Sequence, residues 1–171
     1  MKTFEELKED LLERAKKHHA CQDGYSMGLN AKSKQDLLKA ITDNWYWVLS
    51  TSKMIDANYL EKNFTEEELT EAGIYTRKEH TSNAKSFACG SATVKAYGSA
   101  TVKAYDSATV EAYDSATVEA YGSATVKAYD NSYVEDCTGN INAVSDHGIV
   151  KDYYNHKIYI KKGKFEIIEI E

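Results

Sequence analysis

The chain between positions 90 and 129 repeats one pattern of eight residues, in which a small apolar side chain occupies every second place. The five copies read GSATVKAY, GSATVKAY, DSATVEAY, DSATVEAY and GSATVKAY. In the first copy Ala92, Val94 and Ala96 share one parity, and the threonine and lysine between them share the other. Alternate side chains lie on opposite faces of a β-strand, so each octad predicts one short strand with its alanines and valine facing a thin interior.

Each octad begins with glycine or aspartate, as at Gly98, Asp106, Asp114 and Gly122. Both residue types tolerate the backbone conformations of tight turns, so we expect a corner between successive strands. One strand and one corner leave the chain pointing away from its start, whereas two octads complete a flat coil of 16 residues. A short strict period is typical of solenoids, in which each coil buries its apolar face against its neighbours.

The charged sixth place of the octad distinguishes a two-octad coil from a three-octad coil. With two octads, the charges stack in columns whose signs mostly alternate: Lys95, Glu111 and Lys127, and Lys103, Glu119 and Glu135. With three octads, lysine would stack on lysine and glutamate on glutamate about 4.8 Å apart, which strand pairing disfavours. We therefore expect a flat β-solenoid with two octads per coil.

The same step gathers the eighth-place residues into two ladders: Tyr97, Tyr113 and Tyr129, and Cys89, Tyr105, Tyr121, Cys137 and Tyr153. Cys89 and Cys137 would lie about 14 Å apart, so we expect no disulfide between them. The rings either stack and stiffen the corners, or form an exposed strip for a protein partner or a second copy of the chain. Under the second interpretation the candidate contact residues are Tyr97, Tyr105, Tyr113, Tyr121 and Tyr129.

The middle of the predicted solenoid is acidic. Residues 104–152 contain nine Asp and Glu against two Lys, a net charge of −7, whereas residues 153–164 contain four lysines and no acid. Phosphate contacts need clustered cations, so we expect no direct nucleic-acid binding by the repeats. The acids either keep an edge-rich protein soluble or form a contact surface for a basic partner. In the second case the candidate contact residues are Asp106, Glu111, Asp114, Glu119 and Asp130.

Residues 1–80 lack the repeat and carry helix signals instead. Thr3–Glu6 and Thr65–Glu68 match the capping-box pattern, and Ser33–Asp36 opens a further apolar run at helical spacing. The first predicted helix ends before Gly24, since glycine commonly follows a helix. These signals predict a separate helical head.

The repeat becomes degenerate toward the C-terminus. Asn140 and Asn142 fall at inward places while Ile141 and Ile149 fall outward, which predicts a bulge or register change between 138 and 153. Beyond it, a turn at Lys162-Gly163 predicts a closing hairpin whose charged last strand discourages further edge pairing.

The predicted fold class is therefore α+β in three segments. A small N-terminal helical domain spans residues 1–80, an octapeptide-repeat β-solenoid spans 81–162, and a C-terminal capping strand spans 163–171.

The sequence has no recognisable catalytic or metal-binding pattern. His18, His19 and Cys21 form the tightest group of potential ligands, but their spacing matches no zinc motif and is typical of a polar helix end. No Gly-x-Ser-x-Gly elbow, phosphate loop or HExxH helix occurs, and a repeat gives each copy nearly the same environment. We expect no enzyme activity, no metal and no cofactor.

Two features bear on the compartment. No apolar run approaches the length of a membrane span, and the opening MKTFEELKED is acidic rather than signal-like. Three cysteines without tight spacing are typical of a reducing compartment. We expect a cytoplasmic protein that does not bind membranes.

The phrase AYGSATVKAYGSATVK resembles the 16-residue repeats of bacterial ice-nucleation proteins, which form flat solenoids. In that family a Thr-x-Thr pair recurs where this chain has Thr93-Val94-Lys95. More of the chain, including NFTEEELTEAGIYT in the head, is similar to small uncharacterised proteins of bacterial genomes, prophages and phages that join a helical head to SATV-type octads. The second resemblance implies the same fold and a phage-like setting.

Together these observations favour a non-catalytic protein-protein interaction module. We expect a phage-encoded, anti-CRISPR-like inhibitor of a host defence complex, in the host cytoplasm, acting by surface occupation or by nucleic-acid mimicry. One alternative is a structural solenoid that self-assembles, as a homodimer through the tyrosine ladders or as a filament. A second alternative is an ice-binding protein.

Overall fold

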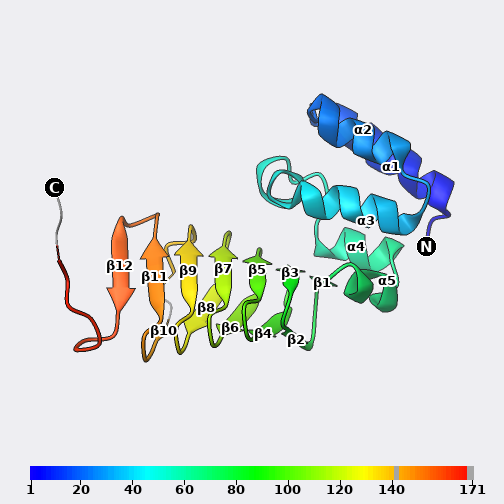
Figure 1. The fold of residues 1–171 in the computed structure, drawn as a ribbon. Coiled ribbons are helices and arrows are strands. Elements are labelled where there is room, and N and C mark those ends of the chain that lie inside the picture. The colour runs from blue at the N-terminus through cyan, green and yellow to red at the C-terminus, as the bar shows by residue number, and fades with distance from the viewer. Residues whose placement is uncertain (141–142, 169–171) are drawn as a thin grey trace. The chain divides into compact units, whose positions relative to one another are not determined.

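The structure, a computed structural model, describes residues 1–140 and 143–168. The chain divides into two compact units, Met1–Thr76 and Arg77–Glu171 (Figure 1). The first is helical, and the second is a parallel β-solenoid of about five turns with 16 residues per turn. The predicted fold class is thus confirmed, and the division falls close to the boundary expected at residue 80. No described helix is both long and apolar enough to cross a lipid bilayer.

The helical unit consists of short helices that begin at side-chain caps. Its elements are α1 (Phe4–Lys17), α2 (Gln22–Asn30), α3 (Lys34–Asp43), the π turn η1 (Trp47–Thr51), α4 (Ala57–Asn63), α5 (Glu66–Glu71) and the short strand β1 (Ile74–Tyr75). Both expected capping boxes form, with Thr3 and Thr65 as the N-cap residues. Each box satisfies two backbone N–H groups that a helix start leaves without partners.

Two helices, α2 and α4, were not predicted, and α2 changes the interpretation of Gly24. This glycine lies inside α2 rather than beyond the end of α1, because the Cys21 sulfur accepts the Gly24 N–H at 3.4 Å and begins a new helix. An added Cβ on Gly24 would meet Asn44 Oδ1 at 3.2 Å, so the small residue also allows close packing against the end of α3.

The core of the helical unit is made of large side chains from several helices. Those buried almost completely are Leu7, Leu37, Leu38, Trp45, Leu60, Phe64 and Ile74. By contrast, α2 buries no residue fully and packs against α1 and α3 with half-buried side chains.

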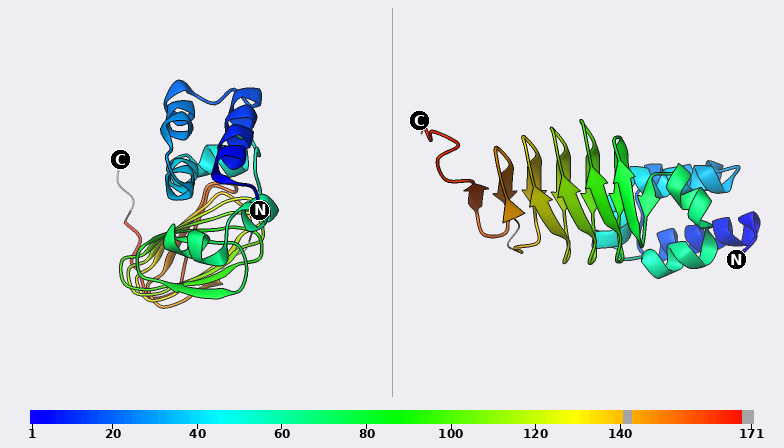
Figure 2. Two further views of the ribbon diagram at one scale, coloured as in Figure 1. Left: turned by 90° about the vertical axis from the view of Figure 1, so that its right-hand side faces the viewer. Right: turned by 90° about the horizontal axis from the view of Figure 1, so that it is seen from below.

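The second unit winds into two parallel sheets that form opposite walls of a flat coil (Figure 2). One sheet has the strand order β3 (Lys85–Ala88), β5 (Thr101–Ala104), β7 (Thr117–Ala120), β9 (Tyr133–Asp136), β11 (Ile149–Asp152) and β12 (Lys157–Ile160). The other has the order β10 (Ala143–Val144), β8 (Thr125–Ala128), β6 (Thr109–Ala112), β4 (Thr93–Ala96) and β2 (Glu79–Ser82).

The register between coils confirms the two-octad interpretation. Val94 pairs with Val110, and Val102 with Val118, so each coil repeats the last after 16 residues. The alanines and valines of the octads face inward and are fully buried, while the sixth-place residues face outward. Each inward side chain lies between the equivalent residues of the coils before and after it. It must therefore pack against copies of itself, which explains the thin interior of alanine and valine.

The expected register change between 138 and 153 is wrong for the described residues. Ala143 pairs with Lys127, and Ile149 with Tyr133, both at the unbroken step of 16. Asn140 follows Ala124 by the same step of 16, but it is exposed, and its side-chain amide donates to the Ala124 carbonyl oxygen at 3.1 Å. Ile141 and Asn142, on which the prediction also relied, lie outside the described residues.

The closing strand lies earlier than predicted. A turn after β11 returns the chain as β12, which pairs antiparallel with β11, Ile149 opposite Ile160. Residues 164–168, where the capping strand was expected, form no strand and are exposed, and residues 169–171 lie outside the described residues. The described residues thus form no hairpin about Lys162-Gly163, and the hairpin that closes the sheet lies one element nearer the repeats.

Candidate interaction surface

The first tyrosine ladder forms one continuous stack along a corner of the solenoid. Tyr97 and Tyr113 lie with ring centroids 4.9 Å apart and planes 7° apart, and Tyr113 and Tyr129 lie 4.8 Å and 10° apart. The stacking interpretation is thus confirmed, and the exposed-strip interpretation remains compatible with it, because Tyr97 is 38% exposed and the other two are half-buried. Stacked rings cover one another's faces, so their edges and hydroxyl groups form the accessible part.

A column of turn residues follows this stack at the same corner: Gly98, Asp114, Asp130 and Asp146. All have positive φ, between 49° and 62°, which glycine adopts readily and aspartate tolerates better than most residues. The Gly98 N–H donates to the Asp114 carboxylate at 2.8 Å, and the Asp114 N–H donates to the Asp130 carboxylate at 3.0 Å. Asp114 and Asp130 therefore each accept a hydrogen bond from the coil before their own, and both residues are exposed.

We call this corner the contact strip and define it by Tyr97, Tyr113 and Tyr129 together with Gly98, Asp114 and Asp130. The sequence predicted the three tyrosines and two aspartates as contact residues and Gly98 as a turn residue, but it did not predict the bonds from N–H to carboxylate. The alternation of glycine and aspartate at the first place of the octad was the available signal, since both residues suit a left-handed corner.

The opposite corner differs in exposure. Tyr105 and Tyr121 stack with centroids 4.9 Å apart, as predicted, but Tyr105 is only 3% exposed. Its ring is therefore not the surface residue expected of a contact site. Asp106 lies exposed at this corner and accepts the Gly90 N–H at 3.3 Å. Cys89 and Cys137 are free thiols, as expected, with Cys89 buried and Cys137 exposed.

The sixth-place charges pair along the predicted columns. Lys127 lies 3.0 Å from Glu111, and Lys103 lies 2.8 Å from Glu119. The hydrogen bond from Lys127 lowers the pKa of Glu111, and the Tyr113 hydroxyl, which donates at 3.1 Å, lowers it further against the opposing effect of partial burial. Glu111 and Glu119 are each paired with a lysine of the same face, so the exposed negative charge of the candidate residues lies at the corners.

Two inward aspartates were not anticipated. Asp136 and Asp152 occupy the column in which earlier coils carry Ala104 and Ala120, and both are buried. The Asp136 carboxylate accepts the Thr138 N–H at 2.8 Å, and the Asp152 carboxylate accepts the Asn155 N–H at 2.8 Å. The hydrogen bonds from Asn155 hold the pKa of Asp152 below its usual range. The column step of 16 was the signal that could have placed them.

The histidine-cysteine group shows no metal-site geometry. Within residues 1–140 and 143–168, no three His, Cys, Asp or Glu side chains come together as metal ligands. Cys21 instead caps α2, as described above.

Comparison with known proteins identifies no relative that carries a similar surface. No family model, no curated protein and no solved structure matches the chain.

Proposed function

We propose that this chain is a non-catalytic protein-interaction module and that the contact strip binds a basic protein surface. The observation that carries this proposal is the coincidence of an ordered tyrosine stack and an exposed column of aspartates on one corner. Tyrosine is enriched in protein interfaces, because a rigid ring contributes area and a hydroxyl at low entropic cost. Aspartates held by the backbone are fixed in position and favour arginine or lysine opposite them.

The partner we propose is a nucleic-acid-binding protein of a host defence complex. Such proteins present clustered cations, which complement the aspartate column, and the resemblance to phage proteins supplies the biological setting. A rigid solenoid loses little conformational entropy on binding, which supports inhibition by occupying a surface.

Surface occupation is favoured over nucleic-acid mimicry. A phosphate mimic needs a dense array of uncompensated charge, and two of the acids proposed for that role, Glu111 and Glu119, are bound to lysines of the same face. Only the corner aspartates remain to imitate phosphates. Mimicry therefore predicts that charge reversal at Glu111 and Glu119 weakens binding, and surface occupation predicts that it does not.

The chain supplies its own conservative variants for the test. Glycine already occupies the first octad place at Gly98 and Gly122, so Asp114→Gly with Asp130→Gly removes two charges without straining the backbone. Asp106→Gly, at the opposite corner, is the matched control. We expect affinity capture from host lysate to recover a stoichiometric basic partner with the wild type and with Asp106→Gly. The double variant should recover at least tenfold less.

Two results would contradict the proposal. One is the absence of any stoichiometric partner from the wild-type capture. The other is equal recovery by the double variant and the control, which would place the contact away from the strip.

Self-assembly is a second candidate, favoured by the C-terminal end of the solenoid. Strand β12 ends its sheet in the described part of the chain, and Ile158 on it is 66% exposed. An exposed apolar edge strand is a template for pairing with another chain. Sedimentation velocity should then show an association that Ile158→Lys removes and Ile167→Lys, off the sheet, does not. A monomer at all concentrations would exclude this candidate.

Ice binding stays an untested alternative. Thr93, Thr109 and Thr125 do form an outward column in register, but each lies two residues from a charged side chain of the neighbouring column. Measurement of thermal hysteresis tests it directly.

A further inference from the structure

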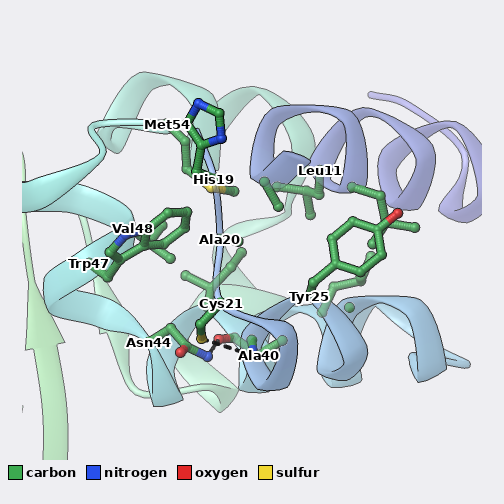
Figure 3. A pocket seen from close by; sticks show the side chains of 16 residues that line it. Leu11, His19, Ala20, Cys21, Tyr25, Ala40, Asn44, Trp47, Val48 and Met54 are labelled. Carbon is green, nitrogen blue, oxygen red and sulfur yellow. Dashed lines mark hydrogen bonds between the residues drawn. The ribbon is translucent and has the colours of Figure 1, made fainter. Parts of the chain in front are cut away.

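The helical unit contains a partly open cavity of about 330 Å³ between α1, α2, α3 and the π turn (Figure 3). Small residues create the space, because α1, α2, α3 and the segments that join them place alanine or glycine toward it: Ala15, Ala20, Gly24, Gly28 and Ala40. A cavity this size is about twice the roughly 150 Å³ that suffices for benzene, and it falls at the lower end of ligand pockets.

The walls of the cavity are apolar and partly aromatic. Leu11, Ile41 and Met54 contribute aliphatic surface, and the rings of Trp47 and Tyr25 lie on opposite sides in Figure 3. None of the lining residues is Lys, Arg, Asp or Glu, and the one imidazole among them, that of His19, is exposed to water. A charged ligand would lose its hydration without finding an opposite charge, so the lining selects neutral molecules.

The side chain of Asn44 gives the cavity a polar group of fixed orientation. The Asn44 amide nitrogen donates to the Ala40 carbonyl oxygen at 2.9 Å, which fixes the orientation of the amide. Its oxygen, Asn44 Oδ1, then faces Gly24, where it would lie 3.2 Å from an added Cβ. Among the described residues no donor bonds this oxygen, so it is available to an N–H or O–H group of a ligand.

We propose that this cavity binds a small neutral aromatic molecule of one or two rings that carries one N–H or O–H donor. The rings pack between Trp47 and Tyr25, and the donor bonds Asn44 Oδ1. Trp47 is also the first residue of the π turn, and single π turns inside helical segments often occur at functional sites. The site is separate from the contact strip, so the two proposals stand or fall independently.

Indole is the probe that tests the proposal, with 1-methylindole as the same ring without its donor. Calorimetric titration of the full chain should show one saturable site for indole and at least fivefold weaker binding of 1-methylindole. Ala40→Leu fills the cavity and should weaken indole binding at least tenfold. Gln35→Leu adds the same side chain to an exposed position of the same helix and should bind indole as the wild type does.

A second readout protects the test against a variant that misfolds. Cys21 lines the cavity, and the other exposed thiol, Cys137, is removed by Cys137→Ser. In that variant, saturating indole should slow the reaction of Cys21 with a thiol reagent at least fivefold. The proposal is overturned if indole shows no saturable binding, if Ala40→Leu binds it as tightly as Gln35→Leu does, or if Cys21 reacts at an unchanged rate.

Discussion

The two units of this chain build their cores from side chains of opposite size. The solenoid interior consists of alanine and valine, each stacked on its own copy in the next coil. The helical unit instead uses Trp45, Phe64 and several leucines, and its irregular helices leave a cavity of 330 Å³. In the solenoid, the register between coils decides which side chains pack together. In the helical unit, the packing depends on the size and shape of each individual side chain. That difference explains why the candidate site of the solenoid lies on its surface, whereas the candidate site of the helical unit is a cavity.

The largest expected effect is a charge in the solenoid interior. Val110→Asp places a carboxylate among alanines and valines that offer no donor, and we expect it to lower the free energy of unfolding by about 4 kcal/mol. Thr109→Asp, one residue away but outward, should change it by less than about 0.5 kcal/mol. Urea unfolding followed by far-ultraviolet circular dichroism measures both. Equal losses would contradict the inward and outward assignment.

A truncation in the helical core should come next. Leu38 is fully buried, so Leu38→Ala should cost about 3 kcal/mol through lost burial and the space left behind. Lys39→Ala, exposed on the same helix, is the control. Both tryptophans, Trp45 and Trp47, lie in this unit, so their fluorescence reports its unfolding. A loss no larger than that of the control would show that Leu38 does not belong to the core.

The corner aspartates should show a backbone effect of intermediate size. Asp114→Ala loses the bond from the Gly98 N–H and forces alanine into a positive φ, at an expected cost of about 2 kcal/mol. Asp114→Gly loses only the hydrogen bond and should cost about 1 kcal/mol. Thermal unfolding of the two variants makes the comparison. If alanine were tolerated as well as glycine, the left-handed corner would be wrong.

Ser132 departs from the alanine of the repeat, and replacing it with alanine should increase the stability of the chain. Ser132 occupies the inward column of Ala116, and its buried hydroxyl has no hydrogen-bond partner among the described residues. Ser132→Ala should therefore stabilise the chain by about 1 kcal/mol. Ser123→Ala, at an exposed outward place, should have no measurable effect. Destabilisation by Ser132→Ala in urea unfolding would mean that the hydroxyl is bonded.

The smallest expected effect is a pH dependence of the charge columns. Because Lys127 lowers the pKa of folded Glu111, this carboxyl stabilises the fold above its unfolded pKa of about 4.3. That contribution is lost as the pH falls through the lower folded pKa. Glu111→Gln and Lys127→Gln should each flatten the decline of the melting temperature on acidification. An unchanged decline in both would show that the pair does not contribute.

The repeat made the solenoid predictable in detail. The alternation of side chains along a strand correctly predicted that Val94 and Val110 face inward, and the step of 16 correctly predicted that Lys103 lies beside Glu119. Both predictions were possible because the same position recurs in every coil. The same rule would have placed Asp136 inward, but the parity of Asn140 and Ile149 suggested a register change that does not occur in the described residues.

The helical unit was less predictable because its contacts join residues that no period relates. Gly24 and Gly28 have low helix propensity, and α2 forms there with a Cys21 cap and with packing against α1 and α3. The cavity depends on where α1, α2 and α3 lie together, which no local pattern records. Asn44 is polar in the sequence, but only the bond to Ala40 shows which of its atoms is available.

The two-octad coil is tested most directly by cysteine pairs across neighbouring coils. In a chain whose native cysteines are replaced, Thr109→Cys with Thr125→Cys joins residues paired in register, with Cα atoms about 4.8 Å apart, within the range of a disulfide. Thr101→Cys with Thr125→Cys would be the pair of a three-octad coil. We predict that mild oxidation forms the disulfide quantitatively in the first variant and not in the second. The opposite result would contradict the 16-residue coil and the contact strip built on it.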